Sequence, residues 1–333
     1  MKFSLRFNND RPVAEYIALA QAAEQAGFDQ FWVSDDLFLR SAVVILAAVA
    51  QATERIEIGT CILNPYTLNP AQMAMEAATL DELSGGRFNL GLSSGSGDFL
   101  QWVGIEQNKP RTAVIETVEA FNKLLNGERA AIDGRFLNWT DEAYLRFEPR
   151  RRIPVYVGAM SPRMLHTIGE IADGGLPLLF PPEHYQNVAP HIAAGAQAAG
   201  RSMDDLDIAA CIWCSVSDDR AAAEDVLREK VAYYGHAMSE TILNQLGLTH
   251  ADFIAIEQAV MVENDMAKAK ALVTDDMLKI GVAGTSADLI TRLEGLVAMG
   301  ARHLSFGPPL GPDPLEALRV IGRDVLPHFR SIT

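Results

Sequence analysis

The chain has 333 residues, of which 49% are hydrophobic and 21% charged, and its formal net charge is −15 at pH 7. This composition is typical of a soluble protein with a large core, and the length fits one α/β barrel or two smaller domains. The acidic charge argues against nucleic-acid binding, which needs clustered lysine and arginine side chains. No apolar run reaches the roughly 20 residues that cross a bilayer, and the first residues do not resemble a secretory signal, so we expect a cytoplasmic protein without a membrane partner.

Strand-like and helix-like segments alternate along the whole chain. In chain order, the strand-like segments are 2–7, 28–34, 56–63, 87–95, 153–160, 175–180, 206–217 and 303–312. The helical patterns lie at 12–27, 41–53, 70–86, 112–127, 161–174, 182–200, 219–235, 286–301 and 314–325. Such alternation indicates βαβ units and a parallel sheet. Eight units over about 300 residues predict a closed (β/α)₈ TIM barrel rather than an open doubly wound sheet.

One segment, about 239–281, is extra to this repeat. It is helical, rich in methionine and acidic, and we interpret it as an insertion before the last βα unit. It either covers the mouth of the barrel or forms an ordinary peripheral pair of helices. No repeat or break in composition divides the chain, so we predict a single domain over 1–333.

The sequence offers no metal centre and no protein nucleophile. Cys211 and Cys214 form a C-x-x-C pattern, but the segment around them is a predicted strand, on which residues three apart face opposite sides. We expect both to be buried thiols. There is no G-x-S-x-G or H-E-x-x-H motif and no cysteine paired with a histidine. A barrel without such groups suggests that a bound cofactor performs the chemistry.

The strand ends are the places to search, because barrel enzymes carry their chemistry at the C-terminal ends of the strands. "SSGSGDF" (93–99) has backbone N–H groups that suit an anion, although such a loop is as often a plain turn. "VGAMSPRML" (157–165) starts a helix at Ser161 and Pro162, either as a phosphate seat or only as a cap. "WVSDDLF" (32–38) places Asp35 beside Asp36, as a catalytic pair, a metal site or a solvated turn.

With these loops in place, the chain resembles the bacterial-luciferase-like superfamily. Within it, the chain is most similar to methylene-tetrahydromethanopterin reductase and related enzymes that use the deazaflavin coenzyme F420. The resemblance covers nearly the whole chain, and its most specific segments are "ATLDELSGGRFNLGL" and "VYVGAMSPRMLHTIGEIADGG". It implies a (β/α)₈ barrel with a flavin or deazaflavin in its mouth.

The resemblance also implies roles for residues around the cofactor. A non-prolyl cis peptide bond between Cys61 and Ile62 would back the cofactor ring, and Asn64 would lie beside that ring. Two loops would hold the ribityl and phosphate portions, namely Gly95, Ser96, Gly97 and Asp98, and Gly158, Ala159, Met160, Ser161 and Pro162.

Two positions depart from the reductase pattern. The reductases carry a glutamate where this chain has Arg6, and an Asp-His pair where it has Asp35 and Asp36. The glutamate is thought to handle the proton in pterin reduction, so its loss argues against that reaction. We assign Arg6, Asp35 and Asp36 as catalytic candidates and expect a salt bridge between Arg6 and Asp36 across neighbouring strands.

We therefore expect hydride transfer between F420 and a small organic substrate. The alternative is an FMN-dependent monooxygenase that uses reduced flavin and oxygen, and a third class is a relative that has lost its cofactor. The insertion and the loop after the last strand would bind the substrate. A homo-oligomer, dimer or larger, is expected because relatives commonly form one and the helix at 41–53 is strongly apolar.

Overall fold

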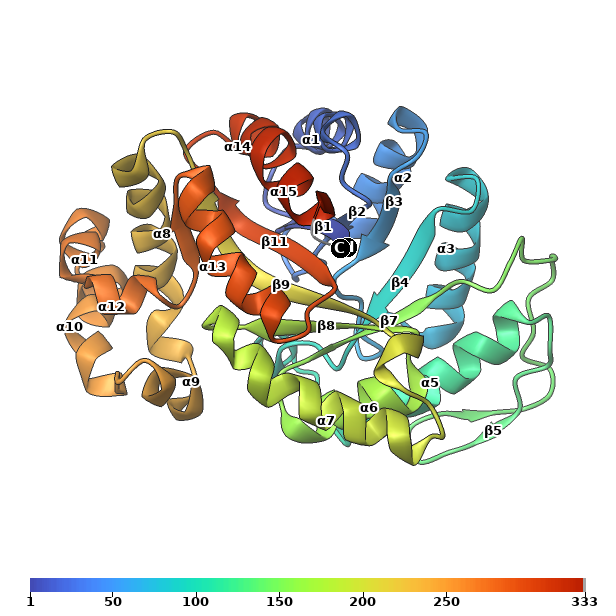
Figure 1. Ribbon diagram of the computed structural model, residues 1–333. Helices are drawn as coiled ribbons and strands as arrows, with labels where there is room; N and C mark the ends of the chain where they lie inside the picture. Colours follow the sequence, from blue (N-terminus) through green and yellow to red (C-terminus); the bar gives the residue numbers. More distant parts are fainter. Residues whose placement is uncertain (332–333) are drawn as a thin grey trace.

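The computed structural model describes residues 1–331, which form a closed barrel of parallel strands surrounded by helices (Figure 1). The barrel strands are β1 (Lys2–Phe7), β2 (Gln30–Val33), β3 (Glu57–Thr60), β4 (Phe88–Leu92), β7 (Val155–Ala159), β8 (Gly174–Leu179), β9 (Asp207–Val216) and β11 (His303–Leu310). They follow one another around the barrel in chain order, and β11 pairs with β1 to close it. The predicted (β/α)₈ fold is confirmed.

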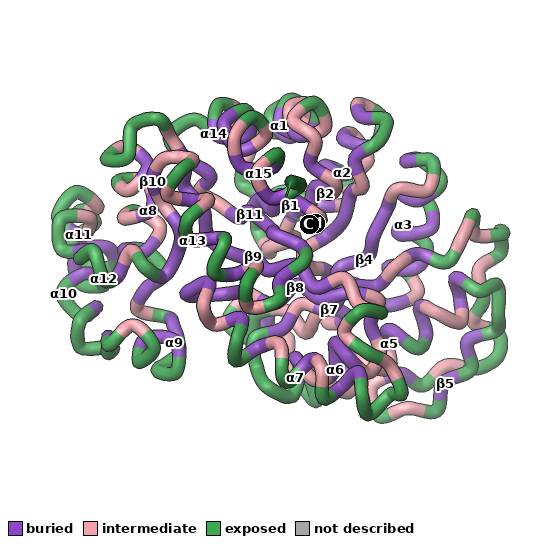
Figure 2. The backbone as a smooth tube through the Cα atoms, in the orientation of Figure 1, coloured by how far each residue is buried: buried purple, intermediate pink, exposed green. Residues whose placement is uncertain are grey.

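Helices cover the outside of the barrel. They are α1 (Val13–Ala26), α2 (Ala42–Ala52), α3 (Pro70–Leu83), α5 (Pro110–Leu125), α6 (Pro162–Ile171), α7 (Tyr185–Ala198), α8 (Arg220–Tyr234), α13 (Ser286–Ala298), α14 (Pro314–Val320) and α15 (Leu326–Ser331). The predicted cap of α6 is confirmed, since Ser161 Oγ accepts a hydrogen bond from the Met164 N–H and Pro162 occupies the first turn. Figure 2 shows buried residues along the strands and exposed residues on the outer faces of the helices. No helix within residues 1–331 is long and apolar enough to span a membrane.

Several short elements have no counterpart in the sequence prediction. They are the hairpin β5 (Ile132–Asp133) and β6 (Asn138–Trp139), the helix α4 (Gly97–Trp102) and the strand β10 (Val282–Gly284). The strand β10 pairs with the C-terminal part of β9, beyond the point where β8 leaves it. The predicted third strand is too long, because β3 ends at Thr60 and only Leu63 pairs again, with Leu92 of β4.

The insertion is helical, as predicted, and packs against one side of the barrel (Figure 1, orange). It contains α9 (Glu240–Gln245), α10 (Ile254–Glu257), α11 (Met266–Leu272) and α12 (Asp275–Leu278). These helices share a hydrophobic cluster with α8, with Phe180 at the end of β8 and with Trp213 on β9. The insertion therefore packs in a second hydrophobic core, which it shares with α8 and the barrel.

The inside of the barrel is filled at its N-terminal end. The rings of Trp32 and Tyr156 meet edge to face, with centroids 4.9 Å apart. Below them, Asp207 accepts hydrogen bonds from Tyr156, His303 and Lys2 at 2.7, 2.7 and 2.6 Å. Burial raises the pKa of the Asp207 carboxyl, but the charges of His303 and Lys2 outweigh it and hold that pKa well below its usual range. This layer closes the N-terminal end, so the remaining space opens at the C-terminal ends of the strands.

Candidate active site

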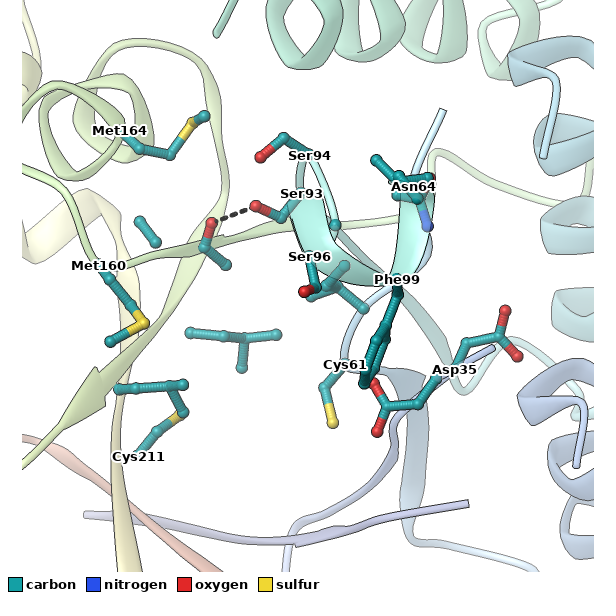
Figure 3. A pocket seen from close by; sticks show the side chains of 18 of the residues that line it. Asp35, Cys61, Asn64, Ser93, Ser94, Ser96, Phe99, Met160, Met164 and Cys211 are labelled. Carbon is teal, nitrogen blue, oxygen red and sulfur yellow. Dashed lines mark hydrogen bonds between the residues drawn. The ribbon is translucent and has the colours of Figure 1, made fainter. Parts of the chain in front are cut away.

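A cavity of about 450 Å³ lies at the C-terminal ends of the strands (Figure 3). Its volume falls within the range of small-molecule and cofactor sites. Twelve of the fifteen residues predicted for the site line it: Arg6, Asp35, Asp36, Cys61, Ile62, Asn64, Gly95, Ser96, Gly158, Ala159, Met160 and Ser161. Segments that are far apart in the sequence thus meet around one cavity.

Three predicted residues do not line the cavity. Gly97 and Asp98 begin α4 and are exposed, and Pro162 is exposed in the first turn of α6. Nine further residues line the cavity that were not predicted from the sequence. They are Leu37, Ser93, Ser94, Phe99, Leu100, Met164, Leu176, Leu178 and Cys211. Ser93, Ser94 and Phe99 belong to the "SSGSGDF" loop, so that motif held the signal for them. No residue of the insertion lines the cavity, so the insertion does not cover it.

The peptide bond between Cys61 and Ile62 is cis, as predicted, and both residues face the cavity. Burial raises the pKa of the Cys61 thiol to about 12, so the sulfur stays protonated and is a poor nucleophile. Cys211 of β9 also lines the cavity, whereas Cys214 lies in the core between the barrel and its helices. The two cysteines therefore face opposite sides of the strand, as expected, and all three cysteines of the chain are free thiols.

One wall of the cavity carries hydrogen-bonding groups without a protein partner. Asn64 Oδ1 accepts from the backbone N–H groups of Tyr66 and Thr67 at 3.1 and 3.0 Å, which leaves its Nδ2 as a donor with no protein acceptor within residues 1–331. The hydroxyls of Ser94 and Ser96 also have no side-chain hydrogen bond in this part of the chain. Free donors beside a cavity are what an oxygen-rich ligand requires.

The opposite wall is built from the end of β7 and the start of α6. Ser93 Oγ donates to the Gly158 carbonyl at 2.7 Å, and this bond ties the two loops together (Figure 3). A Cβ atom at Gly158 would lie 3.1 Å from the Ile62 side chain, so glycine keeps this part of the cavity open. Met160 is half exposed and lines the opening (Figure 3).

The two carboxylates of "WVSDDLF" have different surroundings. Asp35 Oδ1 accepts from the Ala42 N–H at the start of α2, at 2.8 Å. The loop that carries both carboxylates is held by Asn9, whose Nδ2 donates to the carbonyls of Asp36 and Arg40. Burial raises the pKa of both carboxyls, and the negative charge of Asp35 raises that of Asp36 further. Within residues 1–331 no cluster of ligands suits a metal ion, so the metal-site alternative has no support.

The expected salt bridge between Arg6 and Asp36 is wrong. The Arg6 guanidinium instead donates from Nε to Ser305 Oγ at 3.2 Å and from Nη2 to the Ile212 carbonyl at 2.9 Å. Within residues 1–331 no carboxylate oxygen lies within 4.0 Å of the Arg6 guanidinium, so Arg6 forms no ion pair with this part of the chain. Its Nη1 also has no hydrogen-bond acceptor among these residues. The side chain turns toward β11 and β9 because uncharged acceptors lie there. A positive charge therefore lines the cavity without a carboxylate to neutralise it.

Comparisons with known proteins agree with this geometry. The family model described as luciferase-like monooxygenase matches residues 3–303. The 5,10-methylenetetrahydromethanopterin reductase of Archaeoglobus fulgidus is 32% identical over 99% of this chain and 100% of its own. An F420-dependent glucose-6-phosphate dehydrogenase of Nakamurella multipartita is 29% identical over 96% of this chain and 93% of its own. The structure of the coenzyme F420 dependent tetrahydromethanopterin reductase from Methanopyrus kandleri superposes with a TM-score of 0.93, at 29% identity, over 98% of this chain and 99% of that one.

Proposed function

Because the chain belongs to the luciferase-like monooxygenase family of enzymes, we propose that it is an F420-dependent oxidoreductase that acts on a small organic substrate. The observation that carries the proposal is the similarity over almost the full length to proteins named for F420-dependent reactions, one of them superposing at a TM-score of 0.93. The cavity supports it, because its free donors and small residues suit a cofactor of that class.

In this proposal the cavity residues bind and orient the cofactor, which supplies hydride transfer at C5 of its deazaflavin ring. Cys61 and Ile62 would hold the ring, and Asn64 Nδ2 would be its hydrogen-bond donor. The hydroxyls of Ser94 and Ser96 would bind the ribityl and phosphate portions. Apolar residues of the lining, among them Phe99, Leu176 and Leu178, exclude water.

Arg6, Asp35 and Asp36 are the proposed catalytic residues. The uncompensated guanidinium of Arg6 stabilises negative charge that develops on the substrate during hydride transfer. A carboxyl with a raised pKa is able to carry the proton that accompanies the hydride. Asp36 is the better candidate, because burial and the charges of Asp35 and Asp10 raise its pKa against the opposing effects of Lys230 and Ser34. An arginine in place of the reductases' glutamate supports a substrate other than a pterin.

An FMN-dependent monooxygenase is the second candidate, favoured by the description of the matching family model. The test has two arms. In the first, the protein is screened without oxygen, with oxidised F420 against alcohols and with reduced F420 against aldehydes, ketones and imines, and F420 absorbance is followed. In the second, reduced FMN and oxygen are supplied and oxygen uptake is compared with that of free FMN.

We expect turnover of F420 in the first arm and no uptake above the free-flavin rate in the second. Faster oxygen uptake with the protein, together with no F420 turnover, would overturn the proposal in favour of the monooxygenase.

A further inference from the structure

A second cavity, of about 420 Å³, lies on the rim of the barrel mouth. Four parts of the chain form it: the end of β1 with the loop after it, the helix α8, the insertion through Met266, and the end of β11 with the first residue of α14. We call this cavity the rim groove. The insertion, which was expected to bind the substrate, contributes Met266 to this groove and no residue to the first cavity.

The rim groove contains a lysine without a polar partner. Lys230 of α8 makes no hydrogen bond or ion pair within residues 1–331, and its ammonium lies over the rings of Tyr234 and Trp213, 4.5 and 5.3 Å from their centroids. The side chain is partly buried, and burying an unpaired ammonium costs free energy. Such an arrangement lowers stability unless a ligand uses the charge.

The other charged groups around the groove are either paired or carry negative charge. Glu229 lies 3.8 Å from Lys270, and Arg11 pairs with Glu15 at 3.1 Å. Asp10 is exposed and has no ion pair within the described chain. Among the described residues that line the groove, Lys230 is therefore the cation available to a ligand. The negative charges of Asp10 and Glu229 repel a ligand of high negative charge.

The rim groove adjoins the first cavity. Arg6 of β1 and Asp36 of the loop after β2 line the first cavity, and Lys230 of α8 lines the groove. The charges of Arg6 and Asp36 are close enough to Lys230 to act on its ammonium. One substrate molecule of moderate length is thus able to contact both places.

We propose that the rim groove is a binding site for the distal part of the substrate, and that Lys230 binds a carboxylate there. This inference rests on the proposed function, since it places the reacting carbon in the first cavity. A single ammonium matches a monoanion, and the acidic neighbours Asp10 and Glu229 disfavour a phosphate dianion. The rings of Tyr233 and Tyr234 supply an apolar wall for the body of the molecule.

Benzoate and its neutral isostere benzamide test this site by isothermal titration calorimetry with the full-length protein. We expect benzoate to bind at least about tenfold more tightly than benzamide, because a charge-assisted hydrogen bond is lost in the amide. Lys230→Met should remove the preference, and Lys230→Arg should keep it. The matched control is Lys123→Met, which removes a lysine of α5 that lines neither cavity. This variant should bind benzoate as the wild type does. Thermal unfolding verifies that each variant is folded.

Equal affinity for benzoate and benzamide, or no binding of benzoate, would overturn the inference, as would unchanged benzoate binding in Lys230→Met. Inorganic phosphate is titrated in parallel, and binding tighter than that of benzoate would also contradict the carboxylate. F420 binding is measured on the same samples. If F420 fails to bind while benzoate binds through Lys230, the proposed function fails and the anion site stands.

Discussion

The substitution Gly95→Ala tests the cofactor wall of the first cavity. Gly95 has a φ of +75°, and a Cβ atom there would lie 3.0 Å from Cγ and 3.2 Å from Nδ2 of Asn64. The left-handed conformation alone costs an alanine about 1–2 kcal/mol. Asn64 is held by two backbone N–H groups, so relieving the contact also weakens at least one hydrogen bond, worth about 1 kcal/mol.

Gly104→Ala is the matched control. Gly104 has a φ of +73° but nothing within 4 Å of its Cβ position, and it does not line the cavity. Both variants should lose about 1–2 kcal/mol of unfolding free energy through backbone strain, measured by urea denaturation. Gly95→Ala should lose about 1 kcal/mol more, because of Asn64.

Only Gly95→Ala should lose affinity for F420, by about tenfold, because a displaced Asn64 no longer presents its Nδ2 to the ligand. Titration of F420 fluorescence measures this. If Gly95→Ala binds F420 as tightly as Gly104→Ala does, the loop is not part of the cofactor site and the reasoning is wrong.

Three further predictions concern other charged groups. Arg6→Leu should lower turnover on the substrate found in the screen by at least about tenfold, with F420 affinity within about threefold of the wild type; loss of F420 affinity alone would contradict a role toward the substrate. Asp207→Asn should cost about 2–4 kcal/mol of stability in urea, because Lys2 and His303 lose a partly buried carboxylate, somewhat less than the roughly 3–5 kcal/mol of a fully buried pair. The pKa of Asp207 is lowered on folding, so its contribution is present above the unfolded pKa of about 4 and is lost as the pH falls further; equal acid sensitivity of the variant would contradict this. Burial and the charge of Arg6 lower the pKa of Lys230 to about 8, against the opposing charges of Asp10 and Asp36. Benzoate affinity should therefore fall as the pH rises above 8. An affinity that does not change with pH would exclude the Lys230 ammonium as the group that binds benzoate.

The oligomeric state is tested at α2. Val44 is 61% exposed on that helix, although Ile45 and Leu46, which follow it, are buried. We expect a homo-oligomer in light scattering, and Val44→Asp should shift it toward the monomer if α2 lies in the interface. A monomeric wild type would contradict the expectation.

The sequence predicted the barrel because its signals are local. Alternating apolar patterns, glycine stops and the Ser161 cap mark each element without reference to the rest of the chain. The strand β10 and the hairpin β5–β6 were missed because two or three residues are too short for a periodic pattern. The same argument explains why the long strands were found.

The candidate site was predicted where a motif follows a strand and missed where its residues look like core. Leu176 and Leu178 line the cavity from β8, yet alternating leucines in a barrel strand usually indicate packing alone. The prediction of a salt bridge between Arg6 and Asp36 was wrong because it was based only on the neighbouring strands β1 and β2. The acceptors that Arg6 uses, Ile212 and Ser305, lie about 200 and 300 residues away in the sequence, on strands that meet β1 only when the barrel closes.

The most direct test of the central claim is the ultraviolet–visible difference spectrum of the purified protein titrated separately with F420 and with FMN. The account predicts a saturable change with F420, weakened in Gly95→Ala, and no saturable change with FMN over the same range. Saturation with FMN and none with F420 would contradict it.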